Sequence, residues 1–219
     1  MKTWEKWTTW ASVIATAALG AWSEYTAHEA LRLKQPLDKH TEMVRSYQGE
    51  IASAQSRKDL HAVTRLRVEY EKYEEQWRTV ESVAEIVKPL TDLTASKLSP
   101  AATDRLTTLL GQLSAAPAVP NWEPTTMGAA YLALDKYDLA ALEFSNATGG
   151  PKTLALKAAA YGGLATTTFD IQLRQQYTDT AVSSLRESIS SSRGTGVERD
   201  VIRFAQETPT LSEYLPKTK

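Results

Sequence analysis

The chain has 219 residues, of which 42% are hydrophobic and 23% charged, and its formal net charge at pH 7 is −1. This composition is typical of a folded globular protein, and the lack of a basic excess argues against nucleic acid as a partner. The chain contains no Cys and only three His, which excludes disulfides, thiolate metal sites and cysteine nucleophiles. Long segments rich in Ala, Leu, Glu, Lys, Arg and Gln, separated by Gly and Pro, predict an all-α fold.

The first predicted element is a helix with the marks of a membrane anchor. Residues 7–23 are uncharged, and a helix of this length spans about 25 Å, slightly less than a bilayer core of about 30 Å. Aromatic side chains that favour the membrane interface flank the run, and cations precede it. These residues are Lys2, Trp4, Lys6, Trp7, Trp10, Trp22 and Tyr25. Residues 1–25 are therefore expected to anchor a single-pass membrane protein.

The positions of the cations predict its orientation, with a cytoplasmic N-terminus and the bulk of the chain outside, in the periplasm if the protein is bacterial. Two other interpretations stay open. Small residues at positions 15–20 suit a signal peptidase, which would make the protein secreted. Alternatively, the segment is an amphipathic or buried helix of a soluble or peripheral protein, and its Trp side chains pack in a core or an interface.

Residues 26–98 are predicted to form a helical stalk, because apolar residues recur in it at alternating spacings of three and four. The first stripe is Val44, Tyr47, Ile51 and Ala54. The second stripe is Val63, Leu66, Tyr70, Tyr73, Trp77, Val80, Ala84 and Val87. The two stripes are out of phase across residues 55–60. The stalk is thus either a helical hairpin whose second helix is capped by Asp59 or one coiled-coil helix with a stutter.

The second stripe has two candidate partners. It can pack within the chain, or it can mediate self-association with a second copy through Val63, Leu66, Tyr70, Tyr73, Trp77 and Val80. The stalk is expected to end at Lys88-Pro89. Ser99-Pro100 then predicts a capped helix that runs to about Leu113, followed by a proline-containing loop over residues 115–124.

The segment after this loop has the spacing of a helix-turn-helix repeat. Its small and aromatic residues are Met127, Gly128, Ala129, Ala130, Tyr131, Tyr137, Ala140, Phe144 and Ala147. Over residues 121–154 this pattern resembles one tetratricopeptide (TPR) repeat. It departs from the family pattern at Pro124, where Trp is usual and Trp122 stands two residues early, and at Pro151, which comes one residue early. The resemblance implies a TPR-like helical solenoid over residues 99–219 that binds other proteins.

A looser second unit follows the repeat. Residues 154–165 are expected to form its first helix and residues 171–190 its second, before a short terminal helix over residues 197–206. The expected inner face of the second helix is Leu173, Tyr177, Ala181, Leu185 and Ile189. A single helical hairpin cannot bury its own apolar face, so these units are expected to stack.

The first helix of the repeat is expected to line a groove that binds a partner. Helical spacing places the candidate residues on one side of it, and they are Trp122, Thr125, Ala129, Leu132 and Ala133. Because they are small or apolar, they predict an apolar or helical ligand rather than a clamped terminal carboxylate. That ligand can be the chain's own terminal helix around Val201, Ile202 and Phe204. In the alternative, residues of the same chain fill the groove, and the partner binds to the outer face of the repeat.

No catalytic residues, cofactor or metal are expected. The sequence contains no HExxH, EF-hand or Walker phosphate-loop motif, and its second half has no His for a catalytic triad. The layout resembles that of membrane-anchored bacterial TPR proteins. The expected function is therefore a scaffold or adaptor that binds proteins during assembly of an envelope or membrane complex. The alternative is a structural accessory subunit of a larger membrane protein complex.

Overall fold

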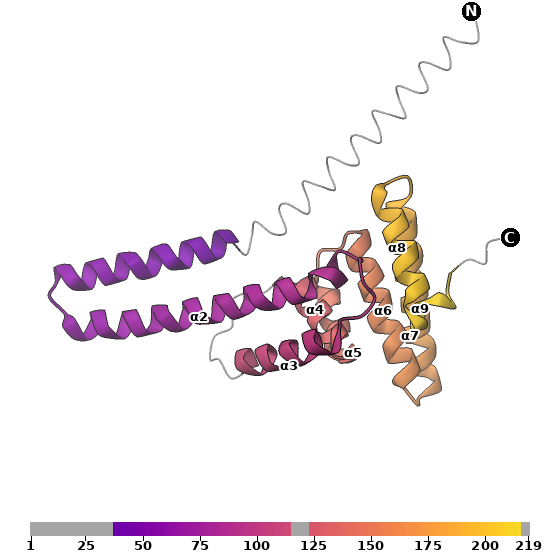
Figure 1. Ribbon diagram of the computed structural model, residues 1–219, viewed down its shortest axis with the longest axis horizontal. Coiled ribbons are helices and arrows are strands. Elements are labelled where there is room, and N and C mark those ends of the chain that lie inside the picture. The colour runs from indigo at the N-terminus through magenta and orange to yellow at the C-terminus, as the bar shows by residue number, and fades with distance from the viewer. Residues whose placement is uncertain (1–36, 115–122, 216–219) are drawn as a thin grey trace, which may run out of the picture.

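The computed structural model describes residues 37–114 and 123–215, and this part of the chain is all-helical, without a β-strand (Figure 1). This confirms the predicted all-α class. A helix over residues 37–56 is followed by α2 (Leu60–Thr91), α3 (Pro100–Ser114), α4 (Pro124–Ala133), α5 (Tyr137–Asn146), α6 (Pro151–Thr167), α7 (Ile171–Ser192), α8 (Gly196–Glu207) and α9 (Pro209–Ser212).

The helix over residues 37–56 and α2 form a long antiparallel hairpin that projects from a cluster of shorter helices (Figure 1). Of the two alternatives for the stalk, the structure therefore contains the hairpin. Lys58 turns the chain with a left-handed φ of 59°, and the N–H of Asp59 donates to the carbonyl oxygen of Ala54 (3.0 Å). The Asp59 carboxylate then accepts from the N–H of Ala62 (3.0 Å), which confirms the predicted cap.

The predicted stripe of α2 packs within the chain, against residues 37–56. Near the turn, Ala54 is buried with Val63 and Leu66. Farther along, His40 stacks on Trp77 with ring centroids 4.2 Å apart. Trp77 is buried, whereas the tyrosines of the stripe that pack beside it are half-buried.

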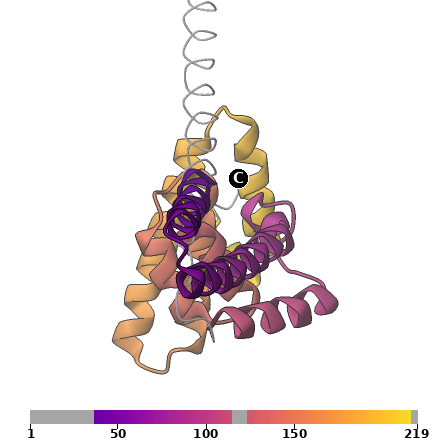
Figure 2. The same cartoon turned by 90° about the vertical axis from the view of Figure 1, so that its left-hand side faces the viewer.

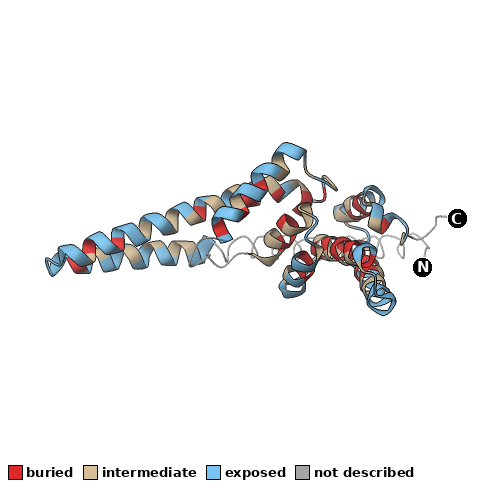
Figure 3. Cartoon of the chain, turned by 90° about the horizontal axis from the view of Figure 1, so that it is seen from below, coloured by how far each residue is buried: buried red, intermediate tan, exposed pale blue. Residues whose placement is uncertain are grey.

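Beyond Trp77 the partner of α2 changes, because α2 enters the cluster of shorter helices (Figure 2). Val83, Val87 and Leu90 are buried in the main core. Figure 3 shows that most buried residues lie in the cluster, whereas the hairpin is mostly exposed or half-buried toward its tip. The C-terminal part of α2 and the helices of the cluster therefore share one core, whereas Ala54, Val63 and Leu66 near the tip form a separate small one. The expected division near residue 98 stays a prediction. The expectation that Lys88-Pro89 ends the segment is early by two residues, because Pro89 lies inside the last turn of α2.

Two further hairpins, α4–α5 and α6–α7, build the cluster, and α6 packs against α5 as well as α7. Small residues bring these helices together. A Cβ added to Gly128 of α4 would lie 2.7 Å from Cε1 of Phe144 on α5, and Gly163 of α6 leaves room for the ring of Tyr137 in the same way. Helix α8 packs on both α6 and α7, and α9 packs on α6 and α8.

Within residues 37–114 and 123–215, no helix combines the length and the apolar character that crossing a membrane requires. Helix α2 has 32 residues, but its exposed face carries charges such as Arg65, Glu69 and Lys72. This finding contradicts the expectation of a single-pass membrane protein with its bulk in the periplasm. The residues expected to form the anchor lie outside the described residues: Lys2, Trp4, Lys6, Trp7, Trp10, Trp22 and Tyr25.

Candidate functional site

The structure separates the residues predicted to line a groove. Thr125 and Ala129 are fully buried, because α6 packs against their side of α4, where the Thr125 hydroxyl lies 3.5 Å from that of Thr153. Leu132 and Ala133 are half-buried and line a cavity at the end of α4. Trp122 lies outside the described residues. The burial of Thr125 and Ala129 agrees with the alternative in which the groove is filled from within the chain, and the binding role of the five residues stays a prediction.

The cavity that Leu132 and Ala133 line is formed by seven helices and the segment between α2 and α3, and its volume is about 390 Å³. Its apolar wall includes Leu90, Leu98, Leu132 and Phe204, and its polar groups include Lys97, Asp135, Tyr137 and Thr210. Ligand sites in proteins have volumes of about 300–1,000 Å³ and mostly apolar walls with a few polar groups. The cavity therefore has the size of a small-molecule site, and its lining combines apolar residues with about as many polar ones.

Asp135 is held at the rim of this cavity by its backbone and by its side chain. It ends α4 with a left-handed φ of 55°, and its N–H donates to the carbonyl oxygen of Leu132 (3.1 Å). The Tyr137 hydroxyl donates to Asp135 Oδ1 (2.7 Å). Burial, together with the hydrogen bond and the charge of Asp135, raises the pKa of Tyr137 to about 12. The phenol therefore stays protonated at neutral pH and fixes the carboxylate by donating to it.

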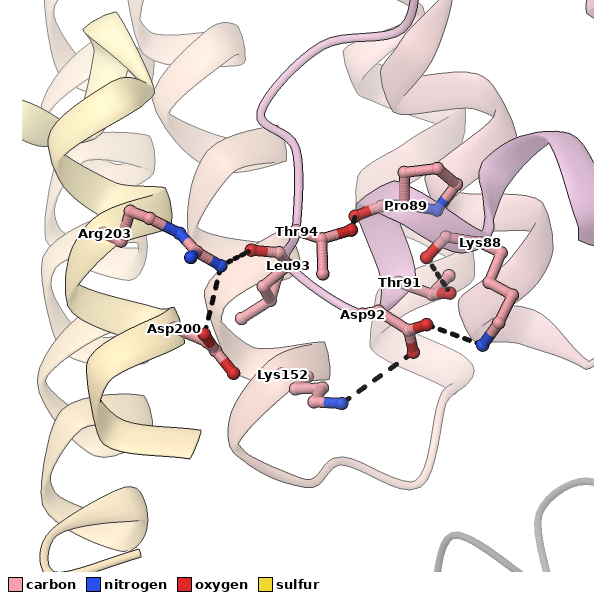
Figure 4. Close-up of polar contacts among 9 residues, drawn as sticks. All are labelled: Lys88, Pro89, Thr91, Asp92, Leu93, Thr94, Lys152, Asp200 and Arg203. Atoms are coloured by element: carbon pink, nitrogen blue, oxygen red, sulfur yellow. Dashed lines mark hydrogen bonds and ion pairs between the residues drawn. The ribbon is translucent and has the colours of Figure 1, made fainter. Parts of the chain in front are cut away.

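The end of α2 next to the cavity is fastened to α8 (Figure 4). Leu93 has a left-handed φ of 58° and is buried, and the N–H of Thr94 donates to the carbonyl oxygen of Pro89 (2.9 Å). These bonds close the helix in the manner of a Schellman motif. Arg203 of α8 donates from Nη2 to the carbonyl oxygen of Leu93 (3.1 Å) and to Asp200 Oδ1 (3.0 Å).

A second contact joins the same end of α2 to α6. Asp92 accepts from Lys88 Nζ (2.6 Å) and lies 3.8 Å from Lys152 Nζ (Figure 4). The Lys152 side chain is largely buried, with 16% exposure, whereas that of Lys88 is 69% exposed. Exposed pairs contribute little to stability, so the more sheltered Asp92–Lys152 pair is the polar contact of Asp92 that adds to the shared apolar core of α2 and α6.

Sequence reasoning missed a second candidate site, an exposed apolar surface at the corner between α6 and α7 and along α5. Phe169 is 95% exposed and Ile171 79%. The surface, called here the α5–α7 apolar surface, consists of Leu139, Leu142, Phe169, Ile171 and Leu173. Leu173 was expected on the inner face of its helix, and its 42% exposure corrects that expectation. The available signal was the pair of large apolar residues around Asp170, where a turn between helices usually carries polar ones.

The two parts of this surface flank α6, which packs against both α5 and α7. The ring of Tyr137, at the start of α5, packs on Gly163 near the end of α6. The Tyr161 hydroxyl lies 3.4 Å from Ser145 Oγ on α5, and the Tyr161 ring lies 6.0 Å from that of Tyr177 on α7. Tyr161 therefore bridges α5 and α7, whose exposed leucines stand about one turn from its partners.

No family model, curated protein or solved structure matches this chain. The TPR resemblance therefore stays a prediction. In the part of the chain that the structure describes, no group of three or more His, Asp and Glu side chains is placed to hold a metal ion.

Proposed function

We propose that this protein is a helical scaffold or adaptor that binds a partner protein through the α5–α7 apolar surface. The observation that carries the proposal is the exposure of Phe169 and Ile171 on a rigid pair of helices. Apolar surface in water costs about 25 cal/mol per Å² relative to burial. Large exposed apolar residues such as the neighbouring Phe169 and Ile171 mark interaction sites where they gather on a surface, and aromatic side chains are common anchors in such sites.

The framework behind this surface supports the proposal, because α6 and α7 pack tightly. Ala181 and Ser184 of α7 face α6 as small buried residues, and Ser188 Oγ donates to the carbonyl oxygen of Pro151 (2.6 Å). A partner that contacts the corner between these helices therefore meets a preorganised surface, which lowers the entropic cost of binding.

We further propose that α4–α5 and α6–α7 are two consecutive TPR-like hairpins and that α8 covers the second one. Three observations support this. Gly128 and Phe144 interlock within the first hairpin. Tyr137 of the first hairpin packs on Gly163 of the second. Helix α8 then packs on both α6 and α7, as the next helix of a stacked array would.

A second function, that of a structural subunit in a larger assembly, is favoured by the tip of the hairpin. Leu60 is 77% exposed there, at the far end of the molecule from the α6–α7 corner (Figure 1). Two distant apolar positions suit a subunit that is held at both ends. Such a subunit copurifies at a fixed stoichiometry, whereas an adaptor exchanges with free partner during washing.

Site-specific photocrosslinking tests the proposed surface. A benzophenone amino acid replaces Phe169 in the full chain, and a second variant carries it at Leu60 as a matched exposed apolar position. We expect a partner to crosslink at position 169, and Ile171→Glu to weaken its capture about tenfold or more, since buried anchors dominate interface energies. Leu60→Glu is the control: if the protein is an adaptor, this variant should capture the partner as well as the unchanged protein does. Capture that tolerates Ile171→Glu in a folded protein would reject the surface.

A further inference from the structure

We propose that the cavity between α2, α4 and α8 binds a small zwitterion with an apolar side chain, namely an apolar amino acid or dipeptide whose α-ammonium and α-carboxylate are both free. This inference is independent of the scaffold function. It rests on an apolar interior and on two opposite charges at the rim that have no ionic partner among the described residues.

The interior of the cavity suits an aliphatic or aromatic side chain. Leu90 and Phe204 are almost fully buried at its wall, and Leu98 and Leu132 add half-buried apolar surface. A volume of about 390 Å³ is within the range of small-ligand sites. Transfer of an apolar side chain from water onto this wall is therefore the main favourable contribution to binding.

Asp135 supplies the site for the ammonium group. Tyr137 donates to Oδ1 of Asp135, so the carboxylate is fixed in position while Oδ2 can still accept. Among residues 37–114 and 123–215, no cation lies within ion-pair distance of Asp135. The C-terminal end of α4, which Asp135 terminates, adds the partial negative charge of the helix dipole. Both contributions attract a cation.

Lys97 supplies the site for the carboxylate group. It lines the same cavity, and no described carboxylate lies within ion-pair distance of it, Asp135 included. Helix α3 begins three residues later at Pro100, and Thr103 of its first turn lines the cavity, so the positive end of the α3 dipole acts in the same direction. Both charges line one cavity, which is what recognition of a zwitterion by its two termini requires.

Calorimetric titration of the full chain with L-leucine and with L-leucyl-L-leucine tests the site. N-acetyl-L-leucine lacks the ammonium group, and L-leucinamide lacks the carboxylate. We expect saturable binding of leucine or of the dipeptide, and at least about tenfold weaker binding of both blocked compounds, because each loses one charge-assisted contact. Absence of saturable binding of both zwitterions at low-millimolar concentration would overturn the proposal. Equal binding of leucine and its N-acetyl derivative would overturn it as well.

Two variants assign the charges. Asp135→Asn keeps the left-handed turn, because Asn adopts this conformation readily, and it should remove the preference for leucine over N-acetyl-leucine. Lys97→Met should remove the preference for leucine over leucinamide. Asp138→Asn and Lys136→Met are the matched controls, since neither residue lines the cavity. Selectivity that survives both cavity substitutions, with unchanged melting temperatures, would place the ligand elsewhere.

Discussion

The hairpin and the helix cluster are both made of antiparallel helices, but different side chains hold them together. In the hairpin, aromatic rings meet across the interface, as His40 and Trp77 do, and the neighbouring rings of Tyr70 and Tyr73 are only half-buried. In the cluster, Gly128 and Gly163 let helices approach until a ring fills the gap completely. Aromatic contacts between well-separated helices leave side chains partly exposed to solvent, whereas small residues allow close packing and a buried core. The cluster should therefore dominate the stability of the chain.

The largest expected effect is in the cluster. Phe144 is 2% exposed and contacts the backbone position of Gly128. Phe144→Ala should lower the free energy of unfolding by about 3–5 kcal/mol, because it removes a buried ring and leaves a cavity. Urea unfolding measures this change. Leu142→Ala on the same helix, where the side chain is 59% exposed, should change it by less than about 0.5 kcal/mol.

The hairpin should respond less strongly to the loss of its most buried ring. Trp77 is 8% exposed and also donates from Nε1 to Glu81 (2.9 Å). Trp77→Ala should cost about 3 kcal/mol, the lower end of the range for large aromatic residues, and Glu75→Ala should cost less than about 0.5 kcal/mol. Hydrogen exchange should show residues 37–56 opening before α6. Equal protection of both segments would contradict the difference between the regions.

Two helix ends with the same backbone conformation should respond in opposite directions. Lys58 and Leu93 both have left-handed φ values, 59° and 58°, which glycine adopts without strain. Lys58 is exposed, so Lys58→Gly should stabilise the hairpin by about 0.5–1 kcal/mol. Leu93 is buried, so Leu93→Gly should destabilise the cluster by about 2 kcal/mol, since losing the side chain outweighs the relief of strain. Thermal unfolding measures both.

The smallest effect concerns alkaline pH. The pKa of Tyr137 in the folded protein is raised to about 12, above the value of about 10 for an unfolded chain. Because the protonated phenol is favoured by folding, its contribution is complete below pH 10 and is lost as the pH rises from about 10 to 12. In Tyr137→Phe, the urea concentration at the unfolding midpoint should change less with pH between about 10 and 12. An unchanged slope would show that Tyr137 does not titrate with folding.

The sequence was sufficient for features that depend on local chemistry. Asp59 caps α2 as expected, and the Ser99 hydroxyl accepts from the N–H of Ala102 at the start of α3. The stripe on α2 was also correct at Trp77, Val80 and Val87, which are buried or pack on the main core; it differs at Ala84. There, Val83 is buried in place of Ala84, because the partner of α2 changes from residues 37–56 to the cluster. A periodic pattern shows which residues share a face, but not which element covers that face.

The same limit explains the candidate sites. Thr125 and Ala129 share a face with Leu132, as the spacing predicted, but α6 covers the first two and leaves the third at a cavity. The cavity itself joins Lys97, Asp135 and Phe204 from distant parts of the chain, and no local pattern connects these residues. The exposure of Phe169 depends on the absence of a described neighbour over one corner, which composition does not reveal.

Because α2 is one continuous helix, a tilt at its base displaces the tip of the hairpin. One helix of 32 residues reaches from the free tip to the core, and the stretch between Leu60 and Val83 is roughly 35 Å long at 1.5 Å per residue. A tilt of about 5° where Arg203 and Lys152 fasten its base would shift the tip by roughly 3 Å. Small adjustments around Leu93 would thus produce larger displacements at the tip of the hairpin.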